Sequence, residues 1–222
     1  MIQKFPSPWS LKGKGYMMLY KFPESFAMKN SFLSNKQKSN FCGGLGSVML
    51  VDYEYSTAGP YRELLYIPGK FNYNENGKKC KRNAITRIFV STMESVDNGR
   101  ENWGIPKELA EFNINKAADN SEIWSIKVDG KIIFSAKMKS FFLPFPVSTK
   151  LMPFPLIQEL NDKTYFTDFS GYGIGKFSKI SDMKIDKNYF PDIACVKPLT
   201  VVRVDNFKIT FPVSRIIEGS LQ

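Results

Sequence analysis

Hydrophobic residues alternate with polar ones, or gather in short runs, in several segments of the first third of the chain. The segment 47–55 is apolar on both faces of an extended chain, which is typical of a central strand. A shorter apolar run over 15–22, followed by Pro23, predicts another buried strand. The turn-forming residues 56–60 separate 47–55 from a further apolar segment, 61–68. We therefore expect 47–55 and 61–68 to pair as a hairpin.

The strongest hairpin signal lies in the second half of the chain. Segments 122–128 and 131–139 alternate on either side of Asp129 and Gly130, a pair that favours a tight two-residue turn. Alternation also predicts strands over 84–92, 164–180 and 200–211. The segment 141–155 carries prolines among phenylalanines, so it is expected to be an extended crossing segment and not a paired central strand.

Few segments favour a helix, and those are short. Residues 24–32 predict one or two helical turns, and 92–98 predict a short helix that begins at the N-cap Thr92 and ends at Gly99. The polar segment 34–40 is expected to be a loop, and 70–83 either a solvated loop or the far end of a long hairpin. No internal repeat or composition break marks a linker. We therefore expect residues 1–222 to form one mainly β domain, mostly antiparallel, closed or two-layered, with a few short helices.

The composition restricts the chemistry more than it restricts the fold. With 222 residues and 43% hydrophobic content, the chain can fill the core of one large domain. It contains no histidine, which removes the usual general base and metal ligand and every Ser-His-Asp or Cys-His scheme. Its three cysteines are far apart in sequence, which indicates neither a zinc site nor a full disulfide framework. We expect no metal and no cofactor.

The charge and hydropathy patterns bear on the partners. A formal net charge of +10 attracts anions, but the basic residues are scattered and form no stripe. The basic cluster 78–82 lacks interleaved aromatic residues that would stack on bases, so a solvated loop is favoured over a nucleic-acid contact. Neither a signal-peptide core nor an apolar run of about 18 residues occurs in the sequence. We expect a soluble, cytoplasmic protein that binds neither nucleic acid nor membranes.

The segment from Gly99 to Phe112 combines glycines, a proline, a tryptophan and five charged residues in a pattern typical of neither a regular helix nor a regular strand. Lys107 has apolar neighbours on both sides in sequence that could carry its amine into an apolar setting. Burial lowers a lysine pKa, and a neutral amine is a nucleophile toward carbonyl carbon. Alternatively, Pro106 begins an ordinary helix and Lys107 lies in solvent. The residues alone favour that second interpretation.

Two further residues have similar alternatives. Glu63 follows a tight turn just inside a predicted strand, where a carboxylate could orient a substrate or move a proton, or else form a salt bridge to an arginine. Arg100 suits a substrate carboxylate but equally an internal one such as Glu63. The glycine-rich run 171–176 lacks the spacing of a phosphate-binding loop and is better explained as a curved or bulged strand.

Two sequence blocks resemble those of the acetoacetate decarboxylase family. The string Gly99-Arg100-Glu101 followed by Gly104-Ile105-Pro106-Lys107 and Leu109 resembles the family signature, in which Gly-Arg-Glu followed by Pro-Lys-Lys-Leu carries a Schiff-base lysine. Asp52 and Tyr53, with the segment 58–63, resemble the earlier block of that family at about the expected distance upstream. The resemblance covers roughly residues 46–112, with a looser fit to Ile217, and implies an antiparallel β-barrel or cone with the active site inside.

The resemblance implies the roles of particular residues. Lys107 matches the lysine that attacks a keto acid and forms an imine, and Glu63 matches a glutamate that lines the site. The residues expected around the substrate are Tyr61, Arg100, Glu101 and Glu108.

The chain also departs from the family pattern. Where the decarboxylases have a second lysine, this chain has Glu108, and Val48 stands where another glutamate would fall. The N-terminal arginine expected near the substrate carboxylate has no firm counterpart, the nearest cations being Lys12 and Lys14. A carboxylate at 108 would raise the lysine pKa if it contacted the amine, leaving burial alone to activate it.

The implied function is therefore a Schiff-base enzyme acting on a small keto acid by decarboxylation or by related aldol or dehydration chemistry. The alternative is a noncatalytic small-molecule binder with the same fold. We also expect a homo-oligomer.

Overall fold

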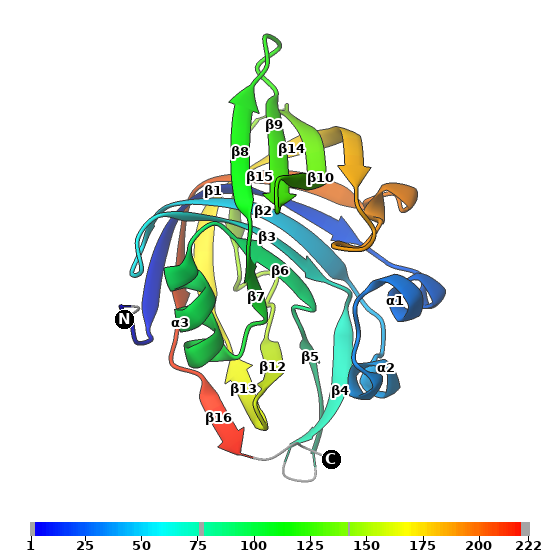
Figure 1. The fold of residues 1–222 in the computed structure, drawn as a ribbon, viewed down its shortest axis with the longest axis vertical. Coiled ribbons are helices and arrows are strands. Elements are labelled where there is room, and N and C mark those ends of the chain that lie inside the picture. The colour runs from blue at the N-terminus through cyan, green and yellow to red at the C-terminus, as the bar shows by residue number, and fades with distance from the viewer. Residues whose placement is uncertain (1–2, 76–77, 142, 219–222) are drawn as a thin grey trace.

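The computed structural model describes residues 3–75, 78–141 and 143–218. Within these residues, an 11-stranded sheet curls into a half-barrel, and a 5-stranded sheet continues it at one end (Figure 1). The strands of the larger sheet are, in spatial order, β7 (Lys107–Leu109), β6 (Arg87–Val90), β3 (Tyr61–Ile67), β2 (Gly46–Ser56), β1 (Trp9–Tyr20), β15 (Thr200–Phe211), β14 (Ser170–Ile185), β10 (Lys131–Ser140), β9 (Glu122–Val128) and β8 (Glu111–Lys116), with β11 (Phe145–Ser148) paired to β14.

The smaller sheet and the helices complete the fold. In spatial order, the smaller sheet comprises β16 (Arg215–Glu218), β13 (Lys163–Thr167), β12 (Leu156–Leu160), β5 (Lys78–Asn83) and β4 (Lys70–Glu75). The helical elements of the described chain are α1 (Glu24–Asn30), α2 (Asn35–Asn40), α3 (Met93–Trp103) and the 3₁₀ turn η1 (Ile193–Cys195). Figure 1 shows α3 on the side of the half-barrel opposite to α1 and α2. None of the helices in the described residues is long and apolar enough to span a membrane.

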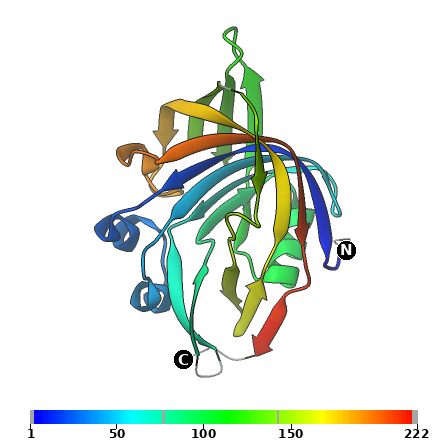
Figure 2. The same ribbon diagram turned by 180° about the vertical axis from the view of Figure 1, so that it is seen from behind.

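The curl of the larger sheet has local causes in β1. The register of β1 shifts against β2 between Lys12 and Gly13, and against β15 between Gly13 and Gly15. Such bulges bend a strand and increase its twist. A Cβ at Gly13 would collide with the carbonyl oxygen of Asp52, so a residue without a side chain is needed where the bent strands approach. Figure 2 shows β14, β15, β1 and β2 following this curve together.

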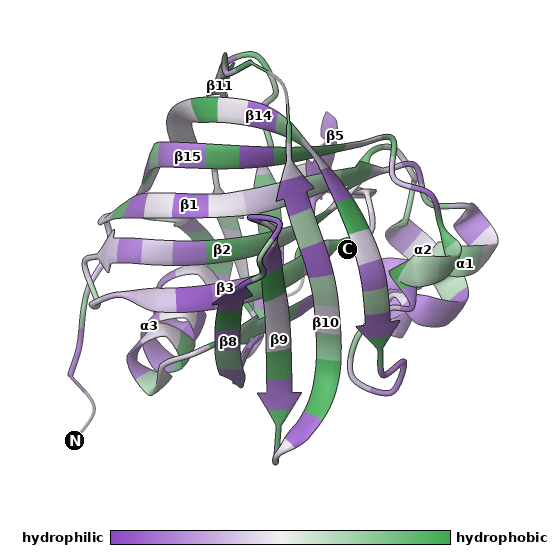
Figure 3. Cartoon of the chain, turned by 90° about the horizontal axis from the view of Figure 1, so that it is seen from above, coloured by the Kyte–Doolittle hydropathy of each residue, from purple (hydrophilic) through white to green (hydrophobic). Residues whose placement is uncertain are grey.

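Two apolar cores lie on opposite faces of the strands β1, β2 and β3. Strands β8, β9 and β10 cross over one face (Figure 3), and the core between them includes Tyr20, Leu50 and Phe134. The second core lies on the concave face and includes Trp9 and Trp103. Strands that are apolar on both faces therefore form the wall between two cores, as the pattern of 47–55 predicts.

Most predicted strands are confirmed. Segments 47–55 and 61–68 form the antiparallel pair β2 and β3, and β2 is internal, between β1 and β3. The hairpin of 122–128 and 131–139 is β9 and β10, with φ values of 49° at Asp129 and 74° at Gly130, as a primed two-residue turn requires. The segment 70–83 forms the hairpin of β4 and β5, the second of the two expected alternatives.

Three predictions of secondary structure were wrong in the type of an element or in its bounds. Residues 35–40 form α2 and not a loop, because Ser34 and Gln37 build a capping box that stabilises a short polar helix. The segment 164–180 is divided between β13 and β14, and each belongs to a different sheet. Helix α3 does begin after the N-cap Thr92, but it continues through Gly99 and ends at Gly104, whose φ is 62°.

Candidate active site

Lys107 is the first residue of β7, a short strand that runs parallel to β6 at the edge of the larger sheet. The residue is 3% exposed, so the helix start with a solvated lysine is excluded. Because neighbouring residues of a strand point to opposite faces, Lys107 points inward and Glu108 points outward. Glu108 pairs on that outer side with Arg87. Glu108, which stands where the decarboxylases have a second lysine, therefore points away from the Lys107 amine.

Two elements, β3 and α3, contribute the contacts of the Lys107 amine. Its Nζ lies 3.3 Å from Oε2 of Glu63 on β3 and donates a hydrogen bond of 2.9 Å to Oγ of Ser95 on α3. It also lies 3.4 Å from the hydroxyl oxygen of Tyr61 and 4.9 Å from the centre of the Tyr61 ring. We call Lys107, Glu63, Tyr61, Tyr53 and Ser95 the amine cluster.

Glu63 is held within this cluster by a second contact. It is 4% exposed, and its Oε1 accepts a hydrogen bond of 3.2 Å from the hydroxyl of Tyr53 on β2. Tyr53 and Tyr61 are register partners across β2 and β3, and their ring centres are 4.6 Å apart. One carboxylate oxygen therefore faces the amine and the other a phenol, which fixes the orientation of the carboxylate.

The electrostatics of the cluster follow from its burial. Burial lowers the pKa of Lys107, and the nearby Glu63 carboxylate opposes this by raising it. Burial, followed by the charge of Glu63, raises the pKa values of Tyr53 and Tyr61 well above that of an ordinary phenol. Both phenols therefore stay protonated at neutral pH and can donate hydrogen bonds.

Helix α3 approaches the lysine closely because Gly99 has no side chain. A Cβ at Gly99 would lie 2.7 Å from Cδ and 2.8 Å from Cε of Lys107. The methylene stem of the lysine therefore occupies the space that any other residue at 99 would fill. This explains why a glycine stands inside α3, although glycine destabilises the interior of a helix.

The amine cluster borders a cavity of about 170 Å³ on the concave face of the half-barrel. Tyr53, Tyr61, Glu63 and Lys107 line one part of it. The rest of its described lining is mainly apolar and comes from β1, β2, β3, β6, β14, β15, the end of α3, the segment 147–156 and further loop residues. Among the described lining residues, Glu63 and Lys107 are the charged ones.

Three residues expected around the substrate lie elsewhere. Arg100 is exposed on α3. Glu101 is exposed on the same helix and pairs with Lys4 at 2.9 Å. With Glu108 on the outer side of β7, none of the three is among the described lining of the cavity, whereas Tyr61 is.

The sequence interpretation missed two members of the cluster, Ser95 and Tyr53. Ser95 and Gly99 are four residues apart, which places them on one face of a helix, and that face meets Lys107. Tyr53 alternates with Val51 on β2, and Val51 is the register partner of Glu63. The sequence shows which residues share a face of α3 or of β2. It does not show which face meets Lys107, so Ser95 and Tyr53 could not be identified from it.

In the described part of the chain, no group of three or more Cys, Asp or Glu side chains comes together. No protein-family profile matches the sequence, and no curated protein matches it. The comparison of structures does find matches.

Solved structures of similar fold cover nearly the whole chain. Acetoacetate decarboxylase from Legionella pneumophila superposes with a TM-score of 0.71 at 15% identity, over 96% of this chain and 88% of that one. An acetoacetate decarboxylase-like enzyme from Sphingomonas wittichii RW1 gives 0.68 at 9% identity, over 99% and 96%. The enduracididine biosynthesis enzyme MppR complexed with pyruvate gives 0.62 at 14% identity, over 96% and 91%. At these identities the likeness establishes the architecture, and the chain has the acetoacetate decarboxylase-like fold.

Proposed function

We propose that the protein is an enzyme that forms a Schiff base between Lys107 and a small keto acid. The observation that carries this proposal is the position of the amine, buried beside an apolar cavity with a carboxylate and hydroxyl groups within 3.4 Å. Burial lowers the pKa of Lys107 and so favours the neutral amine that attack on a carbonyl requires. That MppR, a protein of the same fold, is found complexed with pyruvate supports a keto acid as the partner.

The chemistry can be followed atom by atom. The neutral Nζ of Lys107 attacks the carbonyl carbon, a C–N bond forms, and the carbonyl oxygen leaves as water after taking up protons. The resulting iminium accepts the electron pair of the bond to be broken, so a 3-oxo acid loses carbon dioxide and leaves an enamine. Protonation of the enamine carbon and hydrolysis by water then release the ketone and the free lysine.

Glu63 is proposed to orient the substrate and move protons in these steps. It lies 3.3 Å from the reacting nitrogen, close to the distance of a direct proton transfer. Tyr61 is proposed to donate a hydrogen bond to the substrate from the same side. Arg100, Glu101 and Glu108 lie outside the cavity lining, and the proposal gives them no contact with the substrate.

The ion pair also favours a second candidate function. A carboxylate 3.3 Å from the amine raises the pKa of that amine, and a lysine held as ammonium is no nucleophile. The protein would then bind small molecules reversibly in the same cavity. This candidate predicts that Lys107 titrates near its ordinary value of about 10.4.

Reductive trapping distinguishes the two functions. The protein is incubated with pyruvate or acetoacetate, reduced with borohydride and analysed by intact and peptide mass spectrometry. We expect one stoichiometric adduct on Lys107, no adduct in Lys107→Met, and unchanged trapping in the matched surface variant Lys12→Met. Absence of an adduct at Lys107 with every keto acid, while reversible binding persists, would establish the noncatalytic binder.

We also propose that the protein is a homo-oligomer. Light scattering on the purified protein is expected to give a mass of two or more chains, each of 25.4 kDa. A mass equal to the single chain would contradict this.

A further inference from the structure

The part of the cavity away from the amine cluster is lined mainly by apolar side chains. Partly exposed apolar residues from five parts of the chain face it: Met17, Met49, Met152, Phe169, Val204 and Ile209. Met17 and Met49 are register partners on β1 and β2. Partly exposed apolar surface beside a cavity gains free energy when an apolar ligand covers it.

Several polar groups of this wall already have hydrogen-bond partners within the protein. The indole N–H groups of Trp9 and Trp103 donate to the carbonyl oxygens of Phe5 and Pro212, at 2.9 Å and 2.8 Å. The Thr149 hydroxyl exchanges hydrogen bonds with the backbone of Gly171, at 3.0 Å and 3.3 Å. These side chains therefore offer a ligand mainly apolar surface.

The wall also lacks a charge that would hold a second anionic group. Among the described lining residues, the cation is Lys107, and Glu63 already balances it. A substrate whose far end carries a carboxylate would have to desolvate that charge without a partner, which costs several kcal/mol. An apolar far end meets no such penalty.

The cavity lining extends well beyond the amine. It runs from β3, which carries Glu63, through β2, β1 and β15 to β14. Four strand spacings of about 4.8 Å amount to roughly 19 Å along the curved sheet. A carbonyl compound of three or four carbons held at Lys107 would leave most of this lining uncovered.

We propose that the substrate is a carbonyl compound with an unbranched or aryl apolar tail of about four or more carbons, which lies between Met17, Met49 and the apolar residues of β15. This rests on the proposed Schiff-base function for the position of the carbonyl. The tail site itself depends only on the lining of the cavity.

A chain-length series tests the proposal. Borohydride trapping is measured with 2-oxobutanoate, 2-oxooctanoate and 2-oxooctanedioate, which compare tail length and then a charged end at equal length. Each buried methylene favours binding by about fourfold at most, so we expect half-maximal trapping by 2-oxooctanoate at a concentration at least tenfold lower than by 2-oxobutanoate. The dioate is expected to lose that advantage. Equal concentrations for the three compounds would overturn the tail site and leave the Schiff-base function standing.

A matched pair of variants locates the tail. Met49→Gln makes the wall polar and is expected to reduce the chain-length advantage, the ratio of the half-maximal concentrations of 2-oxobutanoate and 2-oxooctanoate, at least fivefold. Met93→Gln, on the exposed side of α3, is expected to leave this ratio unchanged. An unchanged advantage in Met49→Gln would contradict the proposed position of the tail.

A readout that does not need the lysine separates the two proposals. Binding of 2-octanone and 2-butanone to Lys107→Met is followed by the fluorescence of Trp9 and Trp103, which line the cavity. Tighter binding of 2-octanone together with failed trapping in the wild type would support the tail site and refute the Schiff-base function. Equal binding of the two ketones would refute the tail site.

Discussion

At the scale of single residues, the amine cluster sets two effects against each other. Burial favours the neutral form of Lys107, and Glu63 favours the charged form. The first effect is the larger of the two, so the pKa lies below its ordinary value of 10.5. Tyr53 and Ser95 hold Glu63 and the amine in place by hydrogen bonds of 3.2 Å and 2.9 Å.

Replacing the carboxylate is expected to move the pH profile of the lysine. Only the neutral amine reacts, so trapping increases as the pH rises through the pKa of Lys107. Glu63→Gln removes the charge that raises this pKa, so we expect the midpoint of trapping against pH to shift to lower pH. The measurement is the rate of adduct formation between pH 6 and 10.

The exposed Glu54 provides the matched control for this experiment. It follows Tyr53 in the sequence, but its side chain is exposed on the other face of β2, where it pairs with Lys14 at 3.2 Å. Glu54→Gln is expected to leave the midpoint unchanged. A shift to higher pH in Glu63→Gln would contradict the assigned electrostatics.

At the scale of elements, helix α3 and strand β7 form the site by close approach. The helix brings Ser95 to the amine and leaves at Gly99 the space that the lysine stem fills. The strand turns Lys107 inward and Glu108 outward. The candidate site thus depends on the packing of two short elements as much as on the residues that they carry.

Gly99→Ala tests this packing. In an open helix the change would stabilise the protein by up to about 1 kcal/mol, but here the new methyl group would overlap Cδ and Cε of Lys107. We expect a loss of about 1–3 kcal/mol in the free energy of unfolding, measured with urea, and a loss of trapping.

A double-mutant cycle identifies the cause of that loss. In the Lys107→Ala background the stem is gone, so adding Gly99→Ala is expected to be neutral or stabilising. The same destabilisation in both backgrounds would show that the glycine is required by the helix and not by the lysine.

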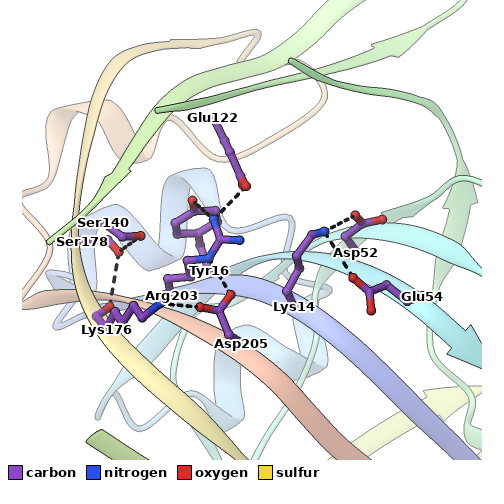
Figure 4. Close-up of polar contacts among 10 residues, drawn as sticks. All are labelled: Lys14, Tyr16, Asp52, Glu54, Glu122, Ser140, Lys176, Ser178, Arg203 and Asp205. Atoms are coloured by element: carbon purple, nitrogen blue, oxygen red, sulfur yellow. Dashed lines mark hydrogen bonds and ion pairs between the residues drawn. The ribbon is translucent and has the colours of Figure 1, made fainter. Parts of the chain in front are cut away.

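At the scale of the whole molecule, a polar cluster joins strand β9, which crosses over the sheet, to strands β1 and β15 of the cavity wall (Figure 4). Arg203 on β15 donates to Glu122 on β9 at 2.8 Å, to the Tyr16 hydroxyl on β1 at 2.7 Å, and to Asp205 at 2.7 Å. The arginine side chain is 18% exposed and that of Glu122 9% exposed. These contacts link the strands that cross over the sheet to the strands that form the cavity wall.

Arg203→Met is expected to destabilise the whole fold. It leaves Glu122 buried without its partner, so we expect the free energy of unfolding in urea to fall by about 2–3 kcal/mol. Lys14→Met is the control from the same surface, because its pairs with Asp52 and Glu54 are more exposed and are worth less than about 1 kcal/mol. Equal losses in the two variants would contradict a linking role for Arg203.

The sequence by itself determined the features that depend on neighbouring residues. Period-two alternation identified the strands, because strand faces repeat every second residue, and turn residues such as Asp129 and Gly130 identified the hairpins. It also identified the segments that contribute Lys107 and Glu63, through two short motifs. It failed at α2, where capping outweighed polarity, and at Gly99, where the reason for the glycine lies in another element.

Only the tertiary structure decided the environment of Lys107. Whether the amine is buried depends on β6, α3 and β3 meeting around it, and contacts between distant segments leave no period in the sequence. The same holds for Ser95 and Tyr53, for the outward direction of Glu108, and for the exposure of Arg100 and Glu101. Sequence patterns report which face of an element is apolar, and the fold decides what that face meets.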